Sequence, residues 1–250
     1  MIRVEQLTKR YGETLAVDGV SFAVRPGEVV GFLGPNGAGK STVLKVLSTW
    51  LRPSSGTAAI AGHDVVREPL AVRRALGYLP EHNALYETMR VDRLLDFVGK
   101  MRGLSRARLA ERTNWVVEHC GVGDVLGKRI HQCSKGYRQR IGVAAALLHD
   151  PAVILLDEPT HGLDVLQVQA FLDFVRELAP THAILFSSHV LAEVVSVSDR
   201  LLVIHRGRIL VDERVEELER RASAAGGEIE DFLLEIVRRG RLGGPQETGT

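Results

Sequence analysis

A glycine-rich loop carrying a lysine and a serine is the stretch best suited to chemistry. Residues 34–42 read GPNGAGKST and fit the pattern G-x-x-x-x-G-K-[ST] of a Walker A phosphate-binding loop. Glycines let backbone amides face an anion, and a helix start adds partial positive charge. We expect Lys40 to reach the terminal phosphates of a nucleotide and Ser41 to bind Mg²⁺. The whole loop is the predicted phosphate site: Gly34, Pro35, Asn36, Gly37, Ala38, Gly39, Lys40, Ser41 and Thr42.

The segments on either side of this loop have the patterns of a strand and a helix. Residues 28–33 are an apolar, β-branched run that predicts a buried strand. Residues 41–51 place apolar side chains at helical spacing, Trp50 among them. The alternative, a glycine-rich turn with a surface lysine, requires neither element. Strand, loop and helix together therefore favour phosphate binding.

Two neighbouring carboxylates follow a second apolar run and could complete a metal site. Residues 152–157 predict a central parallel strand, and Asp157 and Glu158 stand at its end, a Walker B pattern. Asp157 would hold Mg²⁺ directly or through water, and Glu158 would polarise the attacking water as a general base. The alternative is a pair of solvated acids, which the upstream phosphate loop disfavours because the two patterns support one another.

Three further candidates stay open when judged from residue types alone. Ser134 and Gly136 begin a predicted helix and could bind an anion, although a plain N-cap before a basic surface turn is the favoured interpretation. His189 follows the predicted strand 183–188, on the usual ligand side of an open α/β sheet, but a structural histidine is equally compatible. Tyr11, predicted in the loop between the first two strands, could stack on a purine or simply face solvent.

Composition and charge restrict the class of protein. With 250 residues, 45% hydrophobic and 25% charged, the chain can bury the full core of a soluble globular protein. A net charge of +1 disfavours a nucleic-acid binder, which normally carries a basic excess. Cys120 and Cys133 are too few and too far apart for a disulfide framework or a cysteine zinc site, so we expect reduced core thiols.

The sequence predicts no membrane crossing by this chain. Residues 1–5 carry charge at once and lack the apolar core of a signal peptide. The longest apolar stretch, residues 141–156, is interrupted by a His-Asp-Pro sequence and falls short of the roughly 18 residues that span a bilayer. Any membrane function would therefore need a partner that supplies the spanning part.

Hydrophobic periodicity gives a coarse order of elements. Short alternating strands at residues 2–7 and 20–24 predict an antiparallel piece beside the main sheet, and residues 57–62 predict another short strand. Residues 83–150 predict a mostly helical insertion, in which one face carries Leu94, Leu95, Val98 and Met101. Ser105 and Asp164 are expected to cap helices. A hairpin is predicted at residues 200–211.

The C-terminal part is predicted to be separate from the main domain. We place the main domain at residues 1–217 and a C-terminal unit at 218–250. That unit would hold a linker at 222–227, an amphipathic helix at 228–239 stopped by Gly240, and a disordered tail from 241. The apolar stripe of this helix would dock on its own domain or, alternatively, form a dimer contact.

These motifs, in this order, strongly resemble the ATP-binding subunits of ABC transporters over roughly residues 2–215. Residues 134–139 resemble the family signature, residues 162–164 the D-loop, and His189 the switch histidine. Tyr11 occupies the place of the aromatic residue that stacks on adenine. The resemblance implies a P-loop NTPase of ABC ATPase type, an α/β fold with a mixed core sheet flanked by helices, an antiparallel β subdomain and a helical insertion.

The resemblance extends to one subfamily, and some residues differ from the family pattern. Residues 80–83 and 134–140 are similar to subunits that serve ABC-2-type permeases, including gliding-motility-like and drug or lipid exporters. Glu81 stands where most members carry the Q-loop glutamine, and it could still meet Mg²⁺ or its water. Lys135 and Tyr137 depart from the usual signature, and nothing in the sequence explains His161, where a threonine is common.

The resemblance implies a mechanism and partners. Two subunits would pack head to tail and hold ATP between the Walker A loop of one and Ser134 and Gly136 of the other, with ATP and Mg²⁺ as cofactors. Hydrolysis by Glu158, with His189 contacting the γ-phosphate and Lys40 neutralising charge, would power an integral membrane permease from its cytoplasmic face. No nucleic-acid partner is expected. The competing classes are a chromosome- or repair-type ATPase, which would carry a long coiled-coil insertion, and a translation or regulatory factor, which usually joins two such domains.

Overall fold

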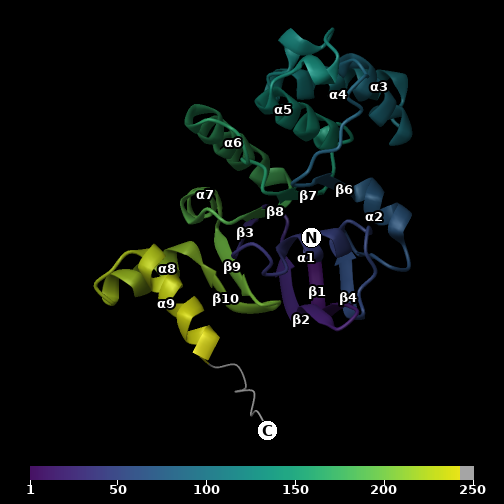
Figure 1. Ribbon diagram of the computed structural model, residues 1–250. Helices are drawn as coiled ribbons and strands as arrows, with labels where there is room; N and C mark the ends of the chain where they lie inside the picture. The colour runs from purple at the N-terminus through teal and green to yellow at the C-terminus, as the bar shows by residue number, and fades with distance from the viewer. Residues whose placement is uncertain (243–250) are drawn as a thin grey trace.

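The computed structural model describes residues 1–242 of the chain (Figure 1). Its strands are β1 (Ile2–Tyr11), β2 (Thr14–Val24), β3 (Val29–Leu33), β4 (Ser55–Ile60), β5 (His63–Asp64), β6 (Leu76–Leu79), β7 (Val153–Asp157), β8 (Ala183–Ser188), β9 (Arg200–His205) and β10 (Arg208–Arg214). Its helices are α1 (Lys40–Leu47), α2 (Pro69–Ala75), α3 (Val91–Met101), α4 (Arg106–His119), α5 (Lys135–Leu147), α6 (Val165–Leu178), α7 (Leu191–Val197), α8 (Val215–Ala224) and α9 (Ile229–Leu242). Short 3₁₀ turns lie at Gly123–Val125, Ile130–Gln132 and Ala179–Thr181.

Two sheets build the molecule, and they confirm the predicted α/β architecture. One is mixed, in the order β10-β9-β3-β8-β7-β6, with parallel strands throughout except for the antiparallel β10–β9 pair. The other is antiparallel, in the order β2-β1-β4-β5. Every residue of β3, β7 and β8 is buried, as expected of parallel strands covered on both faces.

Strand register brings three chain segments to one edge of the mixed sheet. In β8, Ser188 pairs with Leu33 of β3, and Ser187 pairs with Asp157 of β7. The loop that follows β3 and the residues that follow β7 and β8 therefore leave the sheet side by side. Parallel strands place their carboxyl ends at one edge, which is where open α/β folds bind ligands.

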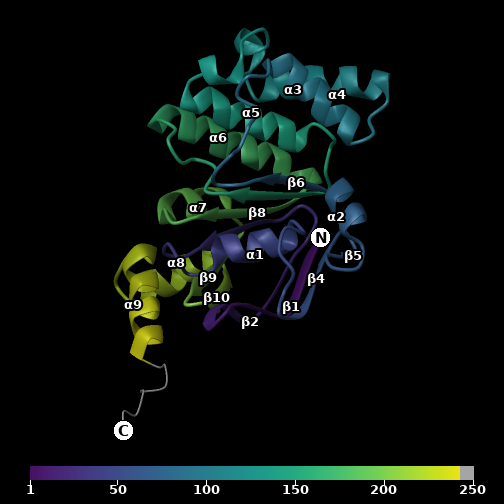
Figure 2. The same cartoon turned by 45° about the vertical axis from the view of Figure 1, so that its right-hand side comes forward.

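Helix α1 lies between the two sheets (Figure 2). Its apolar residues Val43, Leu44, Val46 and Leu47 belong to one core with residues of both sheets. In that core Phe22 of β2 lies 5.9 Å from Phe32 of β3, measured between ring centroids. This packing fixes the direction of α1 and therefore the position of its N-terminus.

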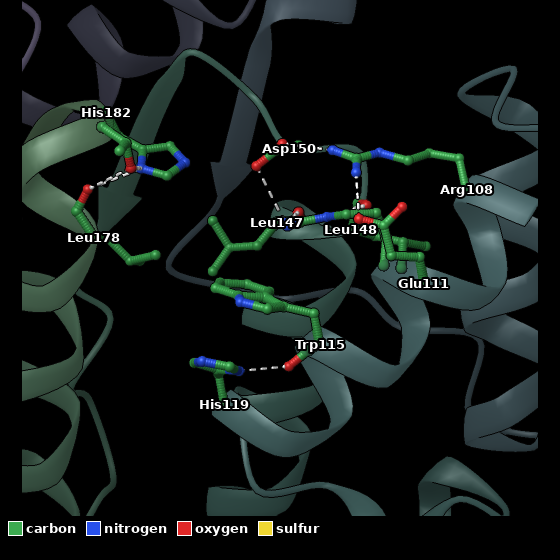
Figure 3. Close-up of polar contacts among 11 residues, drawn as sticks. Arg108, Glu111, Trp115, His119, Leu147, Leu148, Asp150, Leu178 and His182 are labelled. Atoms are coloured by element: carbon green, nitrogen blue, oxygen red, sulfur yellow. Dashed lines mark hydrogen bonds and ion pairs between the residues drawn. The ribbon is translucent and has the colours of Figure 1, made fainter.

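The helical insertion forms a separate group, α3, α4 and α5, at the top of Figure 1. Within this group, a buried arginine of α4, Arg112, connects α4 to the end of α5. It donates from Nε to the Leu148 carbonyl (3.3 Å) and from Nη2 to the Leu147 carbonyl (3.0 Å), and it pairs with Asp150 at 3.3 Å. Figure 3 shows these carbonyls and Asp150 above the Trp115 ring, whose centroid lies 4.3 Å from the Arg112 guanidinium.

We predict that Arg112→Ala lowers the free energy of unfolding by about 2–4 kcal/mol, because it leaves buried carbonyl groups without donors and removes a stacked side chain. Urea denaturation followed by circular dichroism measures this change. Arg106→Ala on the same helix removes an exposed arginine and should change stability by less than about 0.5 kcal/mol. Equal losses in the two variants would show that the Arg112 contacts do not stabilise the fold.

Several predicted details of the main domain were wrong. Tyr11 is the last residue of β1 and pairs with Thr14, because β1 and β2 extend into a tight turn. Trp50 lies beyond the end of α1 and is 74% exposed. Met101, the last residue of α3, is 72% exposed, whereas Leu94 and Leu95 on the same helix are buried. Helical caps at Ser105 and Asp164 are confirmed: both side chains accept a backbone N–H.

The C-terminal part also differs from the prediction. Helix α8 runs to Ala224 and takes up half of the predicted linker, because Leu218 and Ala222 pack into the core. Its start at Val215 places the predicted boundary at residue 217 within a helix. Helix α9 continues through Gly240 to Leu242, since a single glycine weakens a helix without ending it. The predicted tail beyond residue 242 lies outside the described residues.

Helix α9 docks on its own domain. Leu233 is 3% exposed and belongs to the main core, and the Phe232 ring lies 5.1 Å from the guanidinium of Arg221 in α8. Within residues 1–242, every helix is too short or too polar to cross a lipid bilayer.

Candidate active site

The loop between β3 and α1 has a backbone that only glycine suits. Gly37 and Gly39 have φ angles of +78° and +112°. A Cβ on Gly39 would lie 2.7 Å from the Ala16 carbonyl oxygen, and one on Gly34 would lie 2.4 Å from the Ile204 carbonyl oxygen. The first turn of α1 has no side-chain cap and no acidic residue. Its amides are thus left for an anion from outside the helix.

Lys40 lies at the centre of the site. Only 5% of the residue is exposed, and its Nζ donates a 2.6 Å hydrogen bond to the Gly34 carbonyl. The same Nζ lies 3.3 Å from Glu158 Oε1, an ion pair without hydrogen-bond geometry, since this buried oxygen has no hydrogen-bond partner within residues 1–242. The ammonium group is therefore shared between the loop and the carboxylate, and an incoming phosphate could compete for it.

Glu158 leaves β7 through a strained turn. Its φ of +48° is uncommon for a residue with a side chain, and such strain is concentrated at functional sites. Asp157 and Glu158 remain close enough for the Glu158 carboxylate to raise the pKa of Asp157. Glu158 Oε2 accepts a 2.8 Å hydrogen bond from His189 Nδ1. A carboxylate only accepts, so Nδ1 carries the proton.

Asp157 is buried (1% exposed) against two hydroxyl groups. Ser187 Oγ donates to Asp157 Oδ1 at 2.7 Å, and Ser41 Oγ donates at 3.3 Å. Burial raises the pKa of Asp157, and the Glu81 and Glu158 carboxylates raise it further, whereas the two hydroxyl hydrogen bonds lower it. A cation here would compensate the concentrated negative charge.

The donor set fits Mg²⁺. The Ser41 hydroxyl and the Asp157 carboxylate are hard oxygen ligands already in contact, and Glu81 contributes to the same electrostatic environment. Residues 1–242 contain no group of three or more His, Cys, Asp or Glu side chains arranged to hold a metal alone. A magnesium ion at this site would therefore complete its shell with water and phosphate, which is its usual mode of binding.

A cavity of about 340 Å³ opens above the loop and gathers most of the predicted residues. Glu81 and Glu158 line it, and so does Ala16, which the sequence did not indicate as a site residue. The loop contributes Pro35, Asn36, Gly37, Gly39, Lys40, Ser41 and Thr42. Gly34 and Ala38 are buried behind this surface.

Asp157 and His189 contact the lining residues Ser41 and Glu158 without lining the cavity themselves, and three further predicted residues do not line it either. Tyr11 is 46% exposed and has the ammonium of Lys9 at 5.3 Å from its ring centroid. Ser134 caps α5 by accepting from the Tyr137 amide at 3.3 Å, and Gly136 is buried, with a Cβ there meeting Gln167 at 2.6 Å. None of the three lines the cavity above the loop. The described chain therefore supplies only one wall of the predicted nucleotide site.

Sequence reasoning missed the polar residues that support the site. Ser187 binds Asp157, and Gln139 of α5 donates a 2.7 Å hydrogen bond to the Pro159 carbonyl, beside Glu158. Glu193 of α7 accepts hydrogen bonds from Thr160, which follows Glu158, and from Ser188, which precedes His189. For Ser187, the sequence offered one indication, a hydroxyl residue near the end of the predicted strand 183–188. The roles of Gln139 and Glu193 depend on tertiary contacts that the sequence does not show.

Comparisons with known proteins show the family to which the chain belongs. A family model described as ABC transporter matches residues 17–161. ABC transporter ATP-binding protein NatA of Bacillus subtilis (strain 168) is 36% identical over 224 residues, which are 87% of this chain and 91% of the relative. Daunorubicin resistance ATP-binding protein DrrA3 of Streptomyces coeruleorubidus is 39% identical over 243 residues, 97% of this chain and 75% of the relative.

Solved structures show the same fold. An ATP-binding subunit of an ABC transporter superposes with a TM-score of 0.86 at 29% identity, covering 94% of this chain and 99% of that one. A dimeric bacterial ABC transporter cassette superposes with a TM-score of 0.79 at 22% identity, covering 86% and 99%. The predicted P-loop fold of ABC ATPase type is thus confirmed.

Proposed function

The chain belongs to the ABC transporter family of ATP-binding proteins, and we propose that two copies of it bind and hydrolyse Mg²⁺-ATP to power an ABC-2-type export permease. The observation that carries the proposal is that the Glu158 carboxylate contacts both Lys40 of the glycine loop and His189. A cation, a carboxylate base and a histidine that orients the base are the groups that phosphoryl transfer to water requires.

The residues have separable roles in this proposal. The loop amides and Lys40 hold the phosphates of ATP, and Lys40 exchanges its present partners, Gly34 and Glu158, for phosphate oxygens. Glu158, released from that ion pair, accepts the proton of the attacking water, and His189 keeps its carboxylate oriented. Ser41 and Asp157, with Glu81 nearby, would hold Mg²⁺, which would neutralise phosphate charge. Tyr11 is proposed to stack on adenine.

The missing wall of the site supports a dimer. Ser134 and Gly136 lie at the N-terminus of α5, away from the residues that line the loop cavity. We propose that a second copy places its α5 N-terminus over ATP, since helix N-termini attract phosphate. A head-to-tail C2 pair would then bury two nucleotides, and hydrolysis would weaken the contact between copies by removing the shared charge.

An exposed aromatic pair on the helical insertion supports a permease partner. Tyr86 is 58% exposed and Phe97 is 38% exposed, with ring centroids 5.8 Å apart, and Tyr86 follows Glu81 by five residues. Exposed aromatic residues favour protein contacts. We propose that residues 83–150 transmit ATP-dependent motion to a permease, with the chain peripheral on the cytoplasmic face.

Affinity purification of the tagged chain from detergent-solubilised membranes of its source organism tests this function. We expect a polytopic membrane protein to co-purify and the complex to hydrolyse ATP only with Mg²⁺. An untagged strain and the Tyr86→Ser/Phe97→Ser double variant serve as controls, the variant retaining ATPase activity while losing the membrane protein. Retention on ribosomes or DNA, with no membrane protein, would contradict transport and favour a non-transport ABC ATPase.

A further inference from the structure

One carboxylate of α7 joins the two chain segments that carry the proposed base and the histidine. Glu193 Oε2 accepts a 2.7 Å hydrogen bond from Thr160 Oγ1 and a 3.2 Å hydrogen bond from Ser188 Oγ. Thr160 follows Glu158 by two residues, and Ser188 immediately precedes His189. The donors are nearly or completely buried, at 6% and 0% exposure. Neither contact belongs to the proposed chemistry of ATP itself.

The direction of these hydrogen bonds is determined. The Val190 amide donates to Ser188 Oγ at 3.0 Å, so the Ser188 hydroxyl uses its proton for Glu193. Hydroxyl groups that donate to a carboxylate form charge-assisted bonds, which are stronger than neutral ones. Together with the 2.8 Å contact between Glu158 and His189, these bonds close a ring of contacts around the end of β7 and β8.

The segment that this ring holds is under backbone strain. Glu158 has a φ of +48°, a conformation that persists only where neighbouring contacts impose it. Gln139 holds the Pro159 carbonyl on one side (2.7 Å), and Glu193 holds Thr160 on the other. Without Glu193, the turn would keep the Gln139 contact and the 3.0 Å backbone hydrogen bond from the Glu158 amide to the Ser187 carbonyl of β8, but Thr160 and Ser188 would lose the acceptor that joins them.

We propose that Glu193 is a positioning residue for ATP hydrolysis. It acts through Thr160 and Ser188 to fix the Glu158 carboxylate against His189, and so sets the geometry in which Glu158 takes a proton from water. This inference rests on the proposed ATPase function. It assigns no contact between Glu193 and nucleotide, so it predicts an effect on the rate of the chemical step rather than on ATP binding.

Kinetics of the Glu193→Ala variant test the proposal. We expect kcat to fall about 10- to 100-fold, because a misplacement of about 1 Å costs up to roughly this much, while KM changes less than about threefold. Glu193→Gln keeps an acceptor oxygen and should recover most of the rate. Ser196→Ala, on the same helix, removes an exposed hydroxyl that contacts only the Glu193 carbonyl, and it should behave as wild type.

A double-mutant cycle identifies the route. If Glu193 acts through Thr160, adding Thr160→Val to Glu193→Ala should cause little further loss of kcat. A wild-type kcat in Glu193→Ala would overturn the proposal. So would parallel losses in kcat, ATP affinity and melting temperature that Glu193→Gln does not recover, since these would indicate a purely structural role.

A measurement without turnover separates this inference from the proposed function. The proton on His189 Nδ1 is donated in a hydrogen bond to Glu158, so the NMR signal of this proton in the nucleotide-free protein should be protected from solvent exchange. Glu193→Ala should lose that protection, whereas Ser196→Ala should keep it. His189→Gln assigns the signal. If wild type fails to hydrolyse Mg²⁺-ATP, the function fails but this signal still decides the role of Glu193, and unchanged protection in Glu193→Ala would refute it.

Discussion

Glu158→Gln should lower kcat for ATP hydrolysis by at least about 100-fold while changing ATP affinity by less than about threefold. Removal of a general base typically costs 10²- to 10⁴-fold. Glutamine has nearly the same shape but cannot take a proton from water. Affinity should persist because the phosphates are held by the loop amides and Lys40, and loss of the 3.3 Å ion pair leaves Lys40 free for phosphate.

Single-turnover hydrolysis and equilibrium binding of a fluorescent ATP analogue measure the two effects separately. Glu177→Gln removes an exposed carboxylate from α6 by the same substitution and serves as the control, with wild-type values expected for both. Substantial ATPase activity in Glu158→Gln would remove Glu158 from the role of base. A large loss of ATP affinity would instead show that the substitution disturbs the loop.

The second large effect concerns the two halves of the proposed composite site. Lys40→Ala removes the buried ammonium from the loop, so both sites of a dimer should lose phosphate binding and activity should fall at least about 100-fold. Ser134→Asp keeps a good N-cap for α5 but adds a negative charge where phosphate is proposed to bind. It should also abolish activity, although the folded chain still binds ATP at its own loop.

Ser134→Asn is the matched control for the second variant. It keeps the cap and adds no charge, so it should retain more activity than Ser134→Asp. Equal loss in the two substitutions would point to the size of the side chain rather than its charge. Circular dichroism and thermal melting should show the same fold for all three variants.

The parts of the site that lie next to one another in sequence were predictable. The phosphate loop at residues 34–42 could be predicted because its glycine spacing, the preceding apolar run and the following helical pattern all lie in one segment. The burial of β3 and β7 followed from continuous apolar runs, which parallel strands require. These local patterns were sufficient for the α/β architecture and for the carboxylates at the end of β7.

Residues whose roles depend on distant neighbours were not predictable. The ring through Thr160, Ser188 and Glu193 arises because β7 and β8 end side by side, which no local pattern reports. Trp50 and Met101 had helical spacing, but the neighbours needed to bury them are absent at the helix ends. The low helix propensity of glycine led to the wrong prediction that α9 ends at Gly240. The helix continues because the contacts of its preceding turns hold it in place.

The claim that two copies complete one active site is tested most directly by mixing the Lys40→Ala and Ser134→Asp chains. Each alone should be inactive. In the mixture, a heterodimer pairs the intact loop of the Ser134→Asp chain with the intact α5 N-terminus of the Lys40→Ala chain. Random pairing of independent sites then restores about a quarter of the wild-type ATPase activity. A mixture as inactive as its components, with heterodimers detected, would contradict the composite site.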